Sequence, residues 1–405
     1  MADDYLRRTA ITRPILTGEQ QQLLDTTINE WKAACNISSR IGWNYGESRK
    51  TRLQDLAYDT LLEETRLGSQ HAILATRQAA AALSGVEEIE QLDEDYKTSR
   101  PTFTANTVTY DTRTMTLFDD GTVSLSTVDD RIRCDLALPN DEDGYQHQYL
   151  SDEDWELTES TLTRRDGDYY LHLGFRKPKP EKRVEQQADD EDRTVLGIDL
   201  GIVNIATTST AYFASGRELQ HRHREFERIR GNLQETGTQS AHRTIQQMSG
   251  RESRHVRNLL HHVANDIIEE ALEHDCEYIA FENLRHIRER APPVKEFHQW
   301  AHRQLVDLVE YKANAEGLCV EYVSPENTSQ RGPECGYTSR ENRITQTAFE
   351  CESCGATANA DYVGAKNVGW RYVRRGLQSS RRTGDSQLAL KSGTVRPNGR
   401  FVLSD

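Results

Sequence analysis

Along the first hundred residues the spacing of apolar positions changes from strand-like to helical. Residues 5–16 fit a short edge strand, whereas from Thr17 onward apolar residues recur three or four positions apart. The run Thr17-Gly18-Glu19-Gln20 is typical of a helix start. A second helical region, rich in alanine, extends from about residue 52 to residue 83. The pattern therefore predicts one strand followed by a packed group of helices.

From Thr102 the period of the pattern becomes two, which is typical of half-buried strands. Alternating segments occupy residues 104–110, 114–118, 122–125 and 131–136. Asp119-Asp120-Gly121 is a turn signal, and residues 160–175 fit a further hairpin. We expect an antiparallel barrel or sandwich, with the helices of residues 17–95 inserted after its first strand.

The second half of the chain alternates strands and helices after a polar linker at residues 181–193. Strands are predicted at 194–200, 203–209, 210–215, 277–282 and 318–323, and helices at 297–316, at 359–375 and in the polar stretch that ends near residue 275. This order of three strands, helix, strand, helix, strand and helix is that of an RNase H-like domain. From Gly376 the chain is rich in serine, arginine and glycine, so we expect residues 376–405 to be disordered.

Composition narrows the class of protein. At 405 residues the chain is long enough for two or three domains. A mean hydropathy of -0.78 and the lack of an apolar run of roughly 18 residues argue against a membrane span. The first residues lack the apolar core of a secretory signal. Seven cysteines, three of them crowded between residues 335 and 354, predict reduced thiols and a metal site in an intracellular, cytoplasmic protein.

The charge balance points in two directions. Taken alone, a formal net charge of -15 disfavours binding to phosphate. However, the chain has ten lysines against forty arginines, and arginine can hold a phosphate through two parallel hydrogen bonds. Scarce lysine with abundant aspartate and glutamate suggests adaptation to high salt, where an acidic surface keeps a protein soluble. An ordinary acidic cytosolic enzyme is the alternative.

Three carboxylates stand at the ends of predicted strands or at the start of a predicted helix. Asp199 lies in a run of apolar residues and glycines, where a carboxylate is costly unless it is paired or bound to metal. Glu282 ends another strand, and Asp361 opens the helix of residues 359–375. Alone, Asp199 could cap a turn and Asp361 could favour the helix dipole. Together, in this order, they predict a site for two divalent metals that hydrolyses phosphodiesters.

Three cysteines have the spacing of a structural zinc site with one corner missing: Cys335, Cys351 and Cys354. The first cysteine of the expected pair would stand at Gly332, which has no side chain to coordinate a metal. The candidates for a fourth ligand are water and the carboxylates of Glu334, Glu350 and Glu352. We expect weakened zinc binding.

A basic stretch on the predicted helix before residue 275 is a candidate groove for a phosphate backbone. Its candidate nucleic-acid contacts are Arg254, Arg257, Asn258 and His262. They recur at helical spacing, which puts them on adjoining faces of one helix. The alternative is a solvated helix surface.

Several motifs closely resemble those of the transposon-encoded TnpB (OrfB) family. They are Gly197-Ile198-Asp199-Leu200-Gly201, Phe281-Glu282-Asn283-Leu284, Glu310-Tyr311-Lys312-Ala313, Thr328-Ser329-Gln330, and Cys351-x2-Cys354-Gly355 leading to Asn359-Ala360-Asp361. The resemblance covers nearly the whole chain and is most specific from residue 194 to residue 375. Proteins of that family are RNA-guided DNA endonucleases related to type V CRISPR effectors. Together with the salt-adapted composition, the resemblance suggests a haloarchaeal source.

The resemblance implies an α+β, multidomain fold. A wedge-like, N-terminal antiparallel β-barrel would be interrupted by a helical recognition lobe and followed by an RNase H-like, RuvC-like α/β domain with an inserted zinc-ribbon-like segment. The implied boundaries are 1–16 and 101–180 for the barrel, 17–100 for the lobe, 194–326 and 359–375 for the nuclease domain, and 327–358 for the insertion.

The resemblance also implies roles and partners. Asp199, Glu282 and Asp361 would be the catalytic residues and would hold two Mg²⁺ ions, which suit an all-carboxylate site. The three cysteines would hold Zn²⁺, with the fourth ligand absent at Gly332. A guide RNA from the transposon end would pair with a double-stranded DNA target. No membrane is involved, and the oligomeric state does not follow from the sequence.

Three functions compete. The first is an RNA-guided, Mg²⁺-dependent DNA endonuclease encoded by a transposable element. The second keeps the fold but not the catalysis, as an RNA-guided DNA-binding protein or repressor impaired by Gly332. The third is a transposase that cuts and rejoins DNA, or a transposase accessory protein. The three acids argue against the second, and the lack of a His-hydrophobic-His motif argues against the third.

Overall fold

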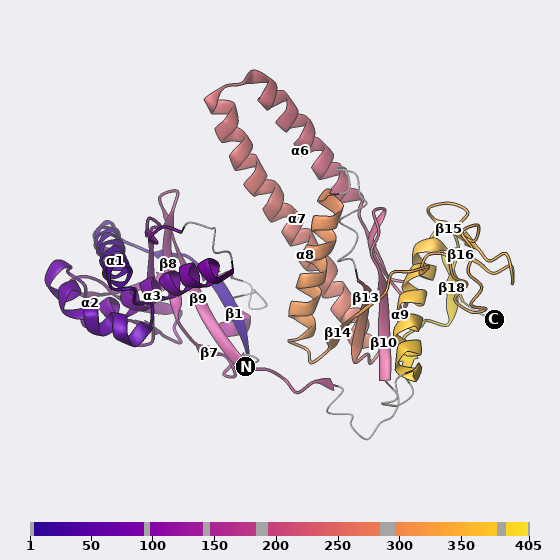
Figure 1. Cartoon of the computed structure of the whole chain (residues 1–405), viewed down its shortest axis with the longest axis horizontal. Coiled ribbons are helices and arrows are strands. Elements are labelled where there is room, and N and C mark those ends of the chain that lie inside the picture. The colour runs from indigo at the N-terminus through magenta and orange to yellow at the C-terminus, as the bar shows by residue number, and fades with distance from the viewer. Residues whose placement is uncertain are drawn as a thin grey trace. The chain divides into compact units, whose positions relative to one another are not determined.

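The computed structural model describes residues 4–92, 98–140, 146–183, 193–283, 296–378 and 386–403. The chain divides into two compact units, residues 1–178 and residues 179–405 (Figure 1). Most of the predicted linker, residues 184–192, lies outside the described residues. Within the described ranges, no helix combines the length and the apolar character needed to cross a membrane. The finer domain boundaries stay predictions.

Three helices follow the first strands of the N-terminal unit: α1 (Gly18–Tyr45), α2 (Lys50–Glu64) and α3 (Ser69–Leu92). The predicted start of α1 is confirmed, because Thr17 and Gln20 cap each other's backbone N–H groups at 3.3 and 3.0 Å. The helix ends at Gly46, whose φ of 59° lies in the left-handed region that glycine adopts without strain. Trp31 of α1 is buried in the core of this unit.

The strands of this unit form two antiparallel sheets. One sheet has the order β1-β9-β8-β3, with β7 also paired to β9, and the other has the order β2-β6-β5-β4. The bounds are β1 (Tyr5–Thr12), β2 (Pro14–Ile15), β3 (Thr107–Tyr110), β4 (Met115–Leu117), β5 (Thr122–Ser126), β6 (Arg131–Leu136), β7 (Glu156–Leu157), β8 (Ser160–Arg165) and β9 (Asp168–Pro178), with the short helix α4 (His147–Leu150) before β7.

The prediction of a closed β-barrel is wrong for the described residues, because no strand pairing joins the two sheets. The chain changes sheets at Arg13, since β1 pairs with β9 and β2, two residues later, pairs with β6. Buried side chains of both sheets, such as Val108 and Leu125, pack with the helices in one core. The sheets therefore share a core without closing.

The C-terminal unit is built on a central sheet of order β12-β11-β10-β13-β14, with β17 paired to β10. The strands are β10 (Arg193–Asp199), β11 (Asn204–Thr208), β12 (Phe213–Ser215), β13 (Tyr278–Glu282), β14 (Cys319–Val323) and β17 (Ser386–Leu388). Strands β10, β13 and β14 run parallel to one another, whereas β11 pairs antiparallel with both of its neighbours, β10 and β12. The predicted strands are confirmed, and they alternate with helices in the predicted order.

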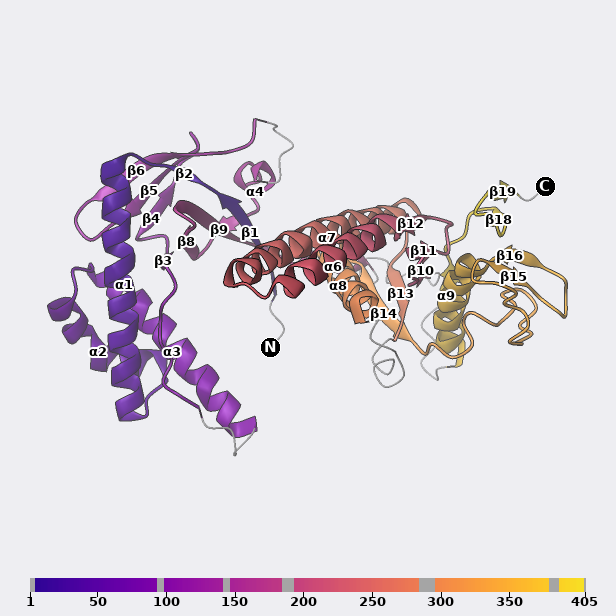
Figure 2. The same ribbon diagram turned by 90° about the horizontal axis from the view of Figure 1, so that it is seen from above.

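Helices cover both faces of this sheet (Figures 1 and 2). They are α6 (Arg217–Thr236), α7 (Gln239–Glu273), α8 (Glu296–Ala313) and α9 (Ala360–Gln378). Along β10, Leu196 and Ile198 pack with α7 and α8, whereas Val195 packs with α9. Successive strand residues face opposite sides, so this alternation assigns every position of β10 to one helix layer.

Two short segments complete the C-terminal unit. The predicted insertion contains the hairpin β15 (Ala348–Glu350) and β16 (Thr357–Asn359), which leads directly into α9. The prediction of a disordered tail is wrong for residues 386–403, which form β17 and the hairpin β18 (Gly393–Val395) and β19 (Phe401–Leu403). The tail is ordered there because β17 pairs in parallel with β10 and buries Leu388 against α9.

Candidate functional site

Asp199 and Glu282 meet at one edge of the central sheet because their strands are in register. Ile198 of β10 lies opposite Phe281 of β13, so Asp199 and Glu282 are the last residues of neighbouring parallel strands. Asp199 is two residues from Gly197, whose Cα faces α9, and it shares that face of the sheet. Glu282 shares the α9 face with Ala280. Both carboxylates therefore lie beneath α9.

Asp361 reaches the same edge from the first turn of α9. The side chain of Asn359 caps the helix by accepting hydrogen bonds from the backbone N–H groups of Asp361 and Tyr362 at 3.0 and 3.1 Å. The Asp361 carboxylate is almost fully buried and accepts a hydrogen bond from Asn204 Nδ2 at 2.9 Å. It also lies 3.4 Å from Arg343 Nη2. These partners hold Asp361 in one orientation.

Glycines let α9 approach the ends of the strands. A Cβ atom on Gly364 would lie 2.8 Å from the Cγ atom of Asp199, and one on Gly197 would lie 2.3 Å from the backbone oxygen of Ala365. Any larger residue at either position would push the helix away from the sheet. The buried side chain of His302 supports the opposite side, where Nε2 lies 2.9 Å from the backbone oxygen of Gly201.

The three carboxylates repel one another electrostatically. Burial raises the pKa of Asp199 well above its usual value, and the negative charges of Glu282 and Asp361 raise it further, whereas Arg343 opposes the shift. Burial also raises the pKa of Glu282, although the hydroxyl of Thr328 donates a hydrogen bond to it and the cations Arg371 and Arg343 act in the opposite direction. Such a cluster is stable in its charged form only with added cations.

This donor set fits a hard divalent cation. The three acids offer only carboxylate oxygens, which Mg²⁺ prefers, and most of their other contacts are hydrogen-bond donors that keep the carboxylates ionised. They are spaced more widely than the cysteines, since among the described residues only the cysteine group brings three ligand atoms within 4.8 Å of one another. The structure thus brings the predicted acids to one edge without making them a compact three-ligand cage.

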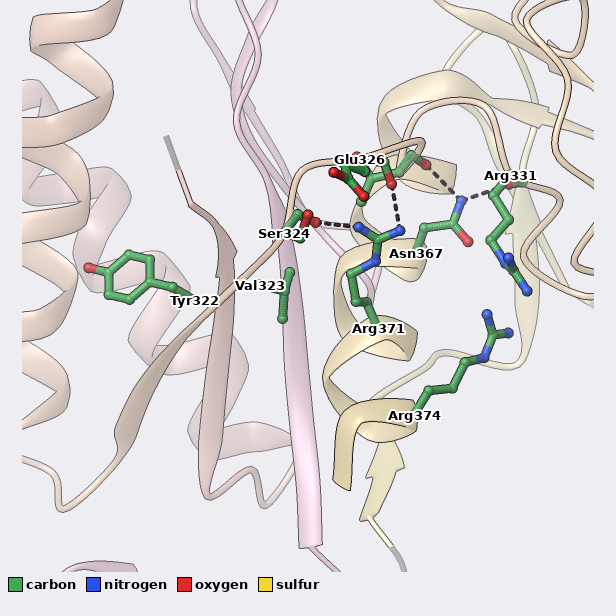
Figure 3. Close-up of a pocket in the computed structure, with 9 residues that line it drawn as sticks. Tyr322, Val323, Ser324, Glu326, Arg331, Asn367, Arg371 and Arg374 are labelled. Carbon is green, nitrogen blue, oxygen red and sulfur yellow. Dashed lines mark hydrogen bonds between the residues drawn. The ribbon is translucent and has the colours of Figure 1, made fainter. Parts of the chain in front are cut away.

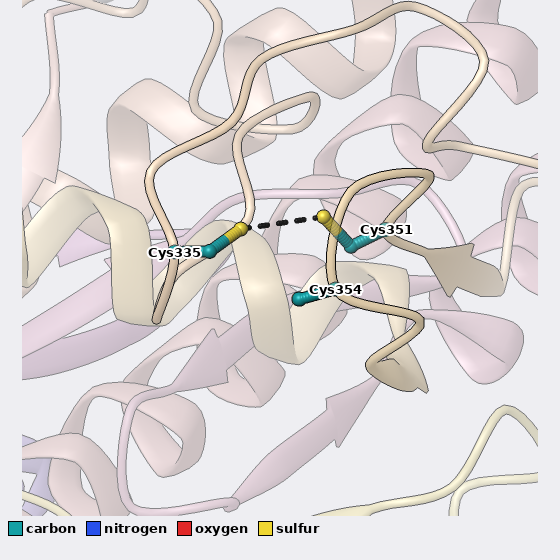
Figure 4. Close-up of side chains that lie close together, drawn as sticks. All are labelled: Cys335, Cys351 and Cys354. Atoms are coloured by element: carbon teal, nitrogen blue, oxygen red, sulfur yellow. Dashed lines mark hydrogen bonds between the residues drawn. The ribbon is translucent and has the colours of Figure 1, made fainter.

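Cys335, Cys351 and Cys354 form that compact group, with Cys335 Sγ and Cys351 Sγ 3.4 Å apart (Figure 4). Burial acts to raise the pKa of Cys351, but hydrogen bonds from the backbone N–H groups of Cys354 and Ser353, and the contact with Cys335, lower it overall. A lowered thiol pKa favours the thiolate, which is the form that binds metal. The group therefore offers three of the four ligands that a structural Zn²⁺ site needs.

The missing fourth corner lies at Gly332, because the two cysteine loops have the same backbone pattern. In one loop Gly332 N donates to Tyr337 O, and Gly336 N donates to Gly332 O. In the other loop Cys351 N donates to Ala356 O, and Gly355 N donates to Cys351 O. Gly332 therefore occupies the position of Cys351. A Cβ atom on Gly332 would lie 2.8 Å from Cys335 Sγ and 3.1 Å from Cys351 Sγ.

The carboxylates considered as substitutes do not join this group. Glu334, Glu350 and Glu352 are all described and exposed, and none belongs to the cluster of ligand atoms around the three thiols. Glu334 instead lies 3.8 Å from Lys366 Nζ of α9. Among the described residues none supplies a fourth ligand atom, so water is the remaining candidate considered.

The predicted nucleic-acid contacts of α7 lie on its solvent side. Arg254, Arg257, Asn258 and His262 are all exposed, whereas the intervening Val256 and Leu260 are buried against the sheet. Exposure is expected both for a phosphate contact and for a plain solvated surface. Their role stays a prediction.

Sequence reasoning missed several side chains that hold the acids. Asn204 and Arg343 contact Asp361, and Gly364 faces Asp199, yet none of them was singled out. Thr328 was noticed only as part of a family motif, although its hydroxyl contacts Glu282. The glycine at the fifth position of α9, three residues after Asp361, was a usable signal for close approach of the helix to the sheet.

Comparisons with known proteins agree with this architecture. A family profile described as "Probable transposase" (OrfB_IS605) matches residues 178–288, and the "Cas12f1-like, TNB domain" profile matches residues 302–368. The chain is 28% identical over 220 residues to the CRISPR-associated endodeoxyribonuclease Cas12f1 of Sulfoacidibacillus thermotolerans, covering 50% of each chain. It is 33% identical over 129 residues to a TnpB-like protein of Methanocaldococcus jannaschii, covering 31% of this chain and 45% of that protein. The chain spans about half the length of these relatives.

Among solved structures, a cryo-EM structure of a Cas12f1-sgRNA-target DNA complex matches with a TM-score of 0.62. The match covers 88% of this chain and 83% of that chain at 16% identity, which shows a shared fold. The central sheet, its acidic edge and the cysteine-bearing insertion thus define a chain with the fold of the Cas12 effectors. The "Probable transposase" profile over residues 178–288 and the TnpB-like relative support a place in the TnpB (OrfB) family. A haloarchaeal source stays a prediction from composition.

Proposed function

We propose that this protein is an RNA-guided DNA endonuclease whose catalytic residues are Asp199, Glu282 and Asp361. The observation that carries the proposal is the meeting of these three carboxylates, from β10, β13 and α9, at one sheet edge. Relatives of the chain carry the names of endodeoxyribonucleases, and a structural neighbour was solved with a guide RNA and target DNA. Proximity of the acids and similarity to the family support the same activity.

The three acids would hold two divalent cations, for which Mg²⁺ suits the oxygen ligands best. The chemistry that such ions supply is activation of the attacking water and stabilisation of the leaving oxygen. The chain's own residues arrange this site. Asn204 and Arg343 orient Asp361, and the Thr328 hydroxyl orients Glu282. Gly364 leaves room for the Asp199 carboxylate beneath α9.

Sequence specificity would come from pairing between a guide RNA and one strand of a double-stranded DNA target, with the protein recognising duplex shape. We further propose that the guide derives from the transposon end. The exposed basic and amide side chains of α7 are candidate contacts for a phosphate backbone: Arg254, Arg257, Asn258 and His262.

An RNA-guided DNA-binding protein without cleavage is the second candidate, and one observation favours it. Gly332 leaves the cysteine group one ligand short at a position that the loop geometry reserves for a ligand. The insertion that carries this group supplies Arg343 to Asp361 and Thr328 to Glu282. A loosened insertion would therefore disturb the acids without removing any of them.

The test is to purify the full chain with its bound RNA and to assay cleavage of matching DNA with Mg²⁺ at high salt. Wild type should cleave, and Asp199→Ala should retain the RNA and bind DNA without cleaving it. The exposed acid Asp307 of α8 provides a matched control, since Asp307→Ala removes a carboxylate from a helix on the face of the sheet opposite α9. Bound RNA without cleavage would favour the second candidate, and no bound RNA would contradict both.

A further inference from the structure

A pocket of about 620 Å³ opens beside the acidic edge, between the segment after β14 and the outer surface of α9 (Figure 3). Three arginines line it: Arg331 from the segment after β14, and Arg371 and Arg374 from α9. Thr328 also lines the pocket, and its hydroxyl contacts Glu282. The pocket and the acidic site therefore share a wall.

One of the arginines fixes the wall of the pocket. Arg371 Nη1 donates to the backbone oxygen of Ser324 at 2.6 Å, and its Nη2 donates to the backbone oxygen of Glu326. Asn367 Nδ2 adds hydrogen bonds to the backbone oxygens of Thr328 and Arg331, at 2.8 and 2.7 Å. All four acceptors are neutral backbone oxygens, so these hydrogen bonds hold the segment in place without placing a negative charge beside Arg371, which interacts electrostatically with Glu282 of the adjacent acidic site.

The other two arginines have N–H groups without hydrogen-bond acceptors among the described residues. Among the described residues, neither Arg331 nor Arg374 has a hydrogen-bond or ion-pair partner for its guanidinium, and Arg331 Nε is fully buried. Figure 3 shows the two guanidinium groups pointing toward each other across the pocket. Burial lowers the pKa of Arg374, and the positive charges of Arg331 and Arg371 lower it further. Glu326, the acid at this pocket, is exposed and forms no ion pair with these arginines.

Such an arrangement is costly unless an anion completes it. Two like charges face each other, and one buried N–H group lacks an acceptor, so both features destabilise a site that has no counter-charge. A phosphate group matches the need, because its oxygens can accept from two guanidinium groups at once. Asn367 Oδ1, also buried without a partner among the described residues, offers an acceptor for a hydroxyl or amine on the same ligand.

We propose that this pocket binds a backbone phosphate of the DNA strand that lies in the adjacent acidic site. The assignment of the strand rests on the proposed function, whereas the anion pocket itself does not. Thr328 connects the two, because it contacts Glu282 on one side and lines the pocket on the other. A phosphate held by Arg331 and Arg374 would fix the register of the strand relative to the carboxylates.

The test measures binding of two probes to the full chain without Mg²⁺, so that cleavage plays no part. The probes are a short single-stranded DNA oligonucleotide and inorganic phosphate, and the variants are Arg331→Ala, Arg374→Ala and Arg400→Ala. Arg400 is the matched control, because it is exposed in the turn between β18 and β19 and lies outside the pocket. Arg331→Lys and Arg374→Lys keep the charge but lose the forked donor geometry.

Each pocket variant should weaken oligonucleotide binding at least about tenfold, because it removes charge-assisted hydrogen bonds. The slope of the logarithm of the binding constant against the logarithm of salt concentration should become shallower by about 0.7, the value for one phosphate on a single strand. Arg400→Ala should match wild type, and the lysine variants should keep the slope while losing affinity. Unfolding midpoints equal to wild type would show that the variants are folded.

Two results would overturn the inference. If the pocket variants and Arg400→Ala bind the oligonucleotide equally, the pocket holds no strand phosphate. If only inorganic phosphate responds to the pocket variants, the site takes a free anion and not a backbone. A chain that binds DNA through Arg331 and Arg374 but never cleaves it would contradict the proposed nuclease function and leave the phosphate site standing.

Discussion

Gly364 of α9 lies directly against the carboxylate of Asp199, so closely that a Cβ atom at this position would be 2.8 Å from the Asp199 Cγ atom. The contact joins a helix and a strand that are more than 150 residues apart in sequence. It brings the first turn of α9, with Asp361, over the end of β10. The spacing of the three acids therefore depends on a residue without a side chain.

Gly364→Ala should abolish the geometry of the acidic site while leaving the chain folded. The added methyl group must displace either α9 or Asp199, and a shift of about 1 Å at a catalytic group can lower a rate about 100-fold. Alanine also favours the helix by about 1 kcal/mol, which offsets part of the strain. Cleavage rate and thermal unfolding midpoint should be measured together.

Gly231→Ala in α6 is the control, because no atom lies within 4 Å of the position that its Cβ would take. It should leave cleavage unchanged and stabilise the chain slightly. A Gly364→Ala variant that cleaves as fast as Gly231→Ala would show that α9 does not set the position of Asp199.

In the absence of divalent metal, the stability of the protein should fall as pH rises. The folded-state pKa of Asp199 is raised, so the folded chain retains a proton that the unfolded chain loses, and stability is lost from about pH 4 up through the raised pKa. In EDTA, Asp199→Asn should remove this loss and raise the midpoint at neutral pH by about 2–4 °C, which is roughly 1 kcal/mol in a unit of this size.

In Mg²⁺ the wild type should be more stable than Asp199→Asn, which is the reverse of their order in EDTA. A ligand that binds only the folded state stabilises it by about 2.7 kcal/mol at a hundredfold excess over its Kd, and Asp199→Asn would lose much of this gain. Asp307→Asn, at an exposed position of α8, should follow wild type in both conditions. Equal pH and Mg²⁺ responses in Asp199→Asn and wild type would contradict a charged cluster at this edge.

Gly332→Cys should restore a four-thiolate zinc site. The backbone of the 332–337 loop already matches that of the 351–356 loop, so the new thiol would enter the position equivalent to Cys351 once the Cys335 side chain, 2.8 Å from the new Cβ atom, has moved. Zinc affinity should rise by at least about tenfold, since even the loss of groups behind the ligands costs that much. Competition with a chromogenic chelator would measure the affinity.

Cys335→Ser in the Gly332→Cys background serves as the control, because it returns the site to three thiols. Wild type should lose zinc to the chelator before Gly332→Cys does. A wild-type protein that already holds one zinc per chain as tightly as Gly332→Cys would refute the prediction of weakened binding.

Thr328→Val should shift the acid limb of the pH–rate profile of cleavage to higher pH. The Thr328 hydroxyl donates to Glu282 and lowers the pKa of that carboxylate, so its loss allows burial to raise the pKa further. A hydrogen bond to a charged group is worth about 1.5–3 kcal/mol, which corresponds to a shift of about one pKa unit or more. Thr338→Val, at an exposed position of the same insertion, should leave the profile unmoved.

Much of the fold was predictable because its signals are local. The change from helical to alternating periodicity, the capping residues Thr17 and Gln20, and the apolar runs that became β10 and β13 lie within short windows. The closed barrel and the disordered tail were wrong because both depend on distant pairing. Only the pairing of β2 with β6, and that of β17 with β10, decides these outcomes.

In the candidate site too, residues with a local sequence signal were predicted and residues placed by contacts between distant segments were not. Asp199, Glu282 and Asp361 were predicted from buried or helix-start positions, and the gap at Gly332 was predicted from cysteine spacing. Their supports, Asn204 and Arg343, carry no signal of their own, because a polar residue in a loop has many ordinary roles. The sheet register and the insertion bring them to Asp361.

The sequence by itself indicated the candidate residues for the chemistry, since carboxylates in apolar runs are costly without a partner or a metal and the three thiols have the spacing of a zinc site. Only the tertiary structure decided how those groups meet. Parallel register aligned Asp199 with Glu282, and close packing of α9 through Gly364 added Asp361. It also placed Arg331 opposite Arg374 around a pocket that no local pattern indicates. Proximity between segments far apart in the chain is a property of packing, so residue type alone cannot specify it.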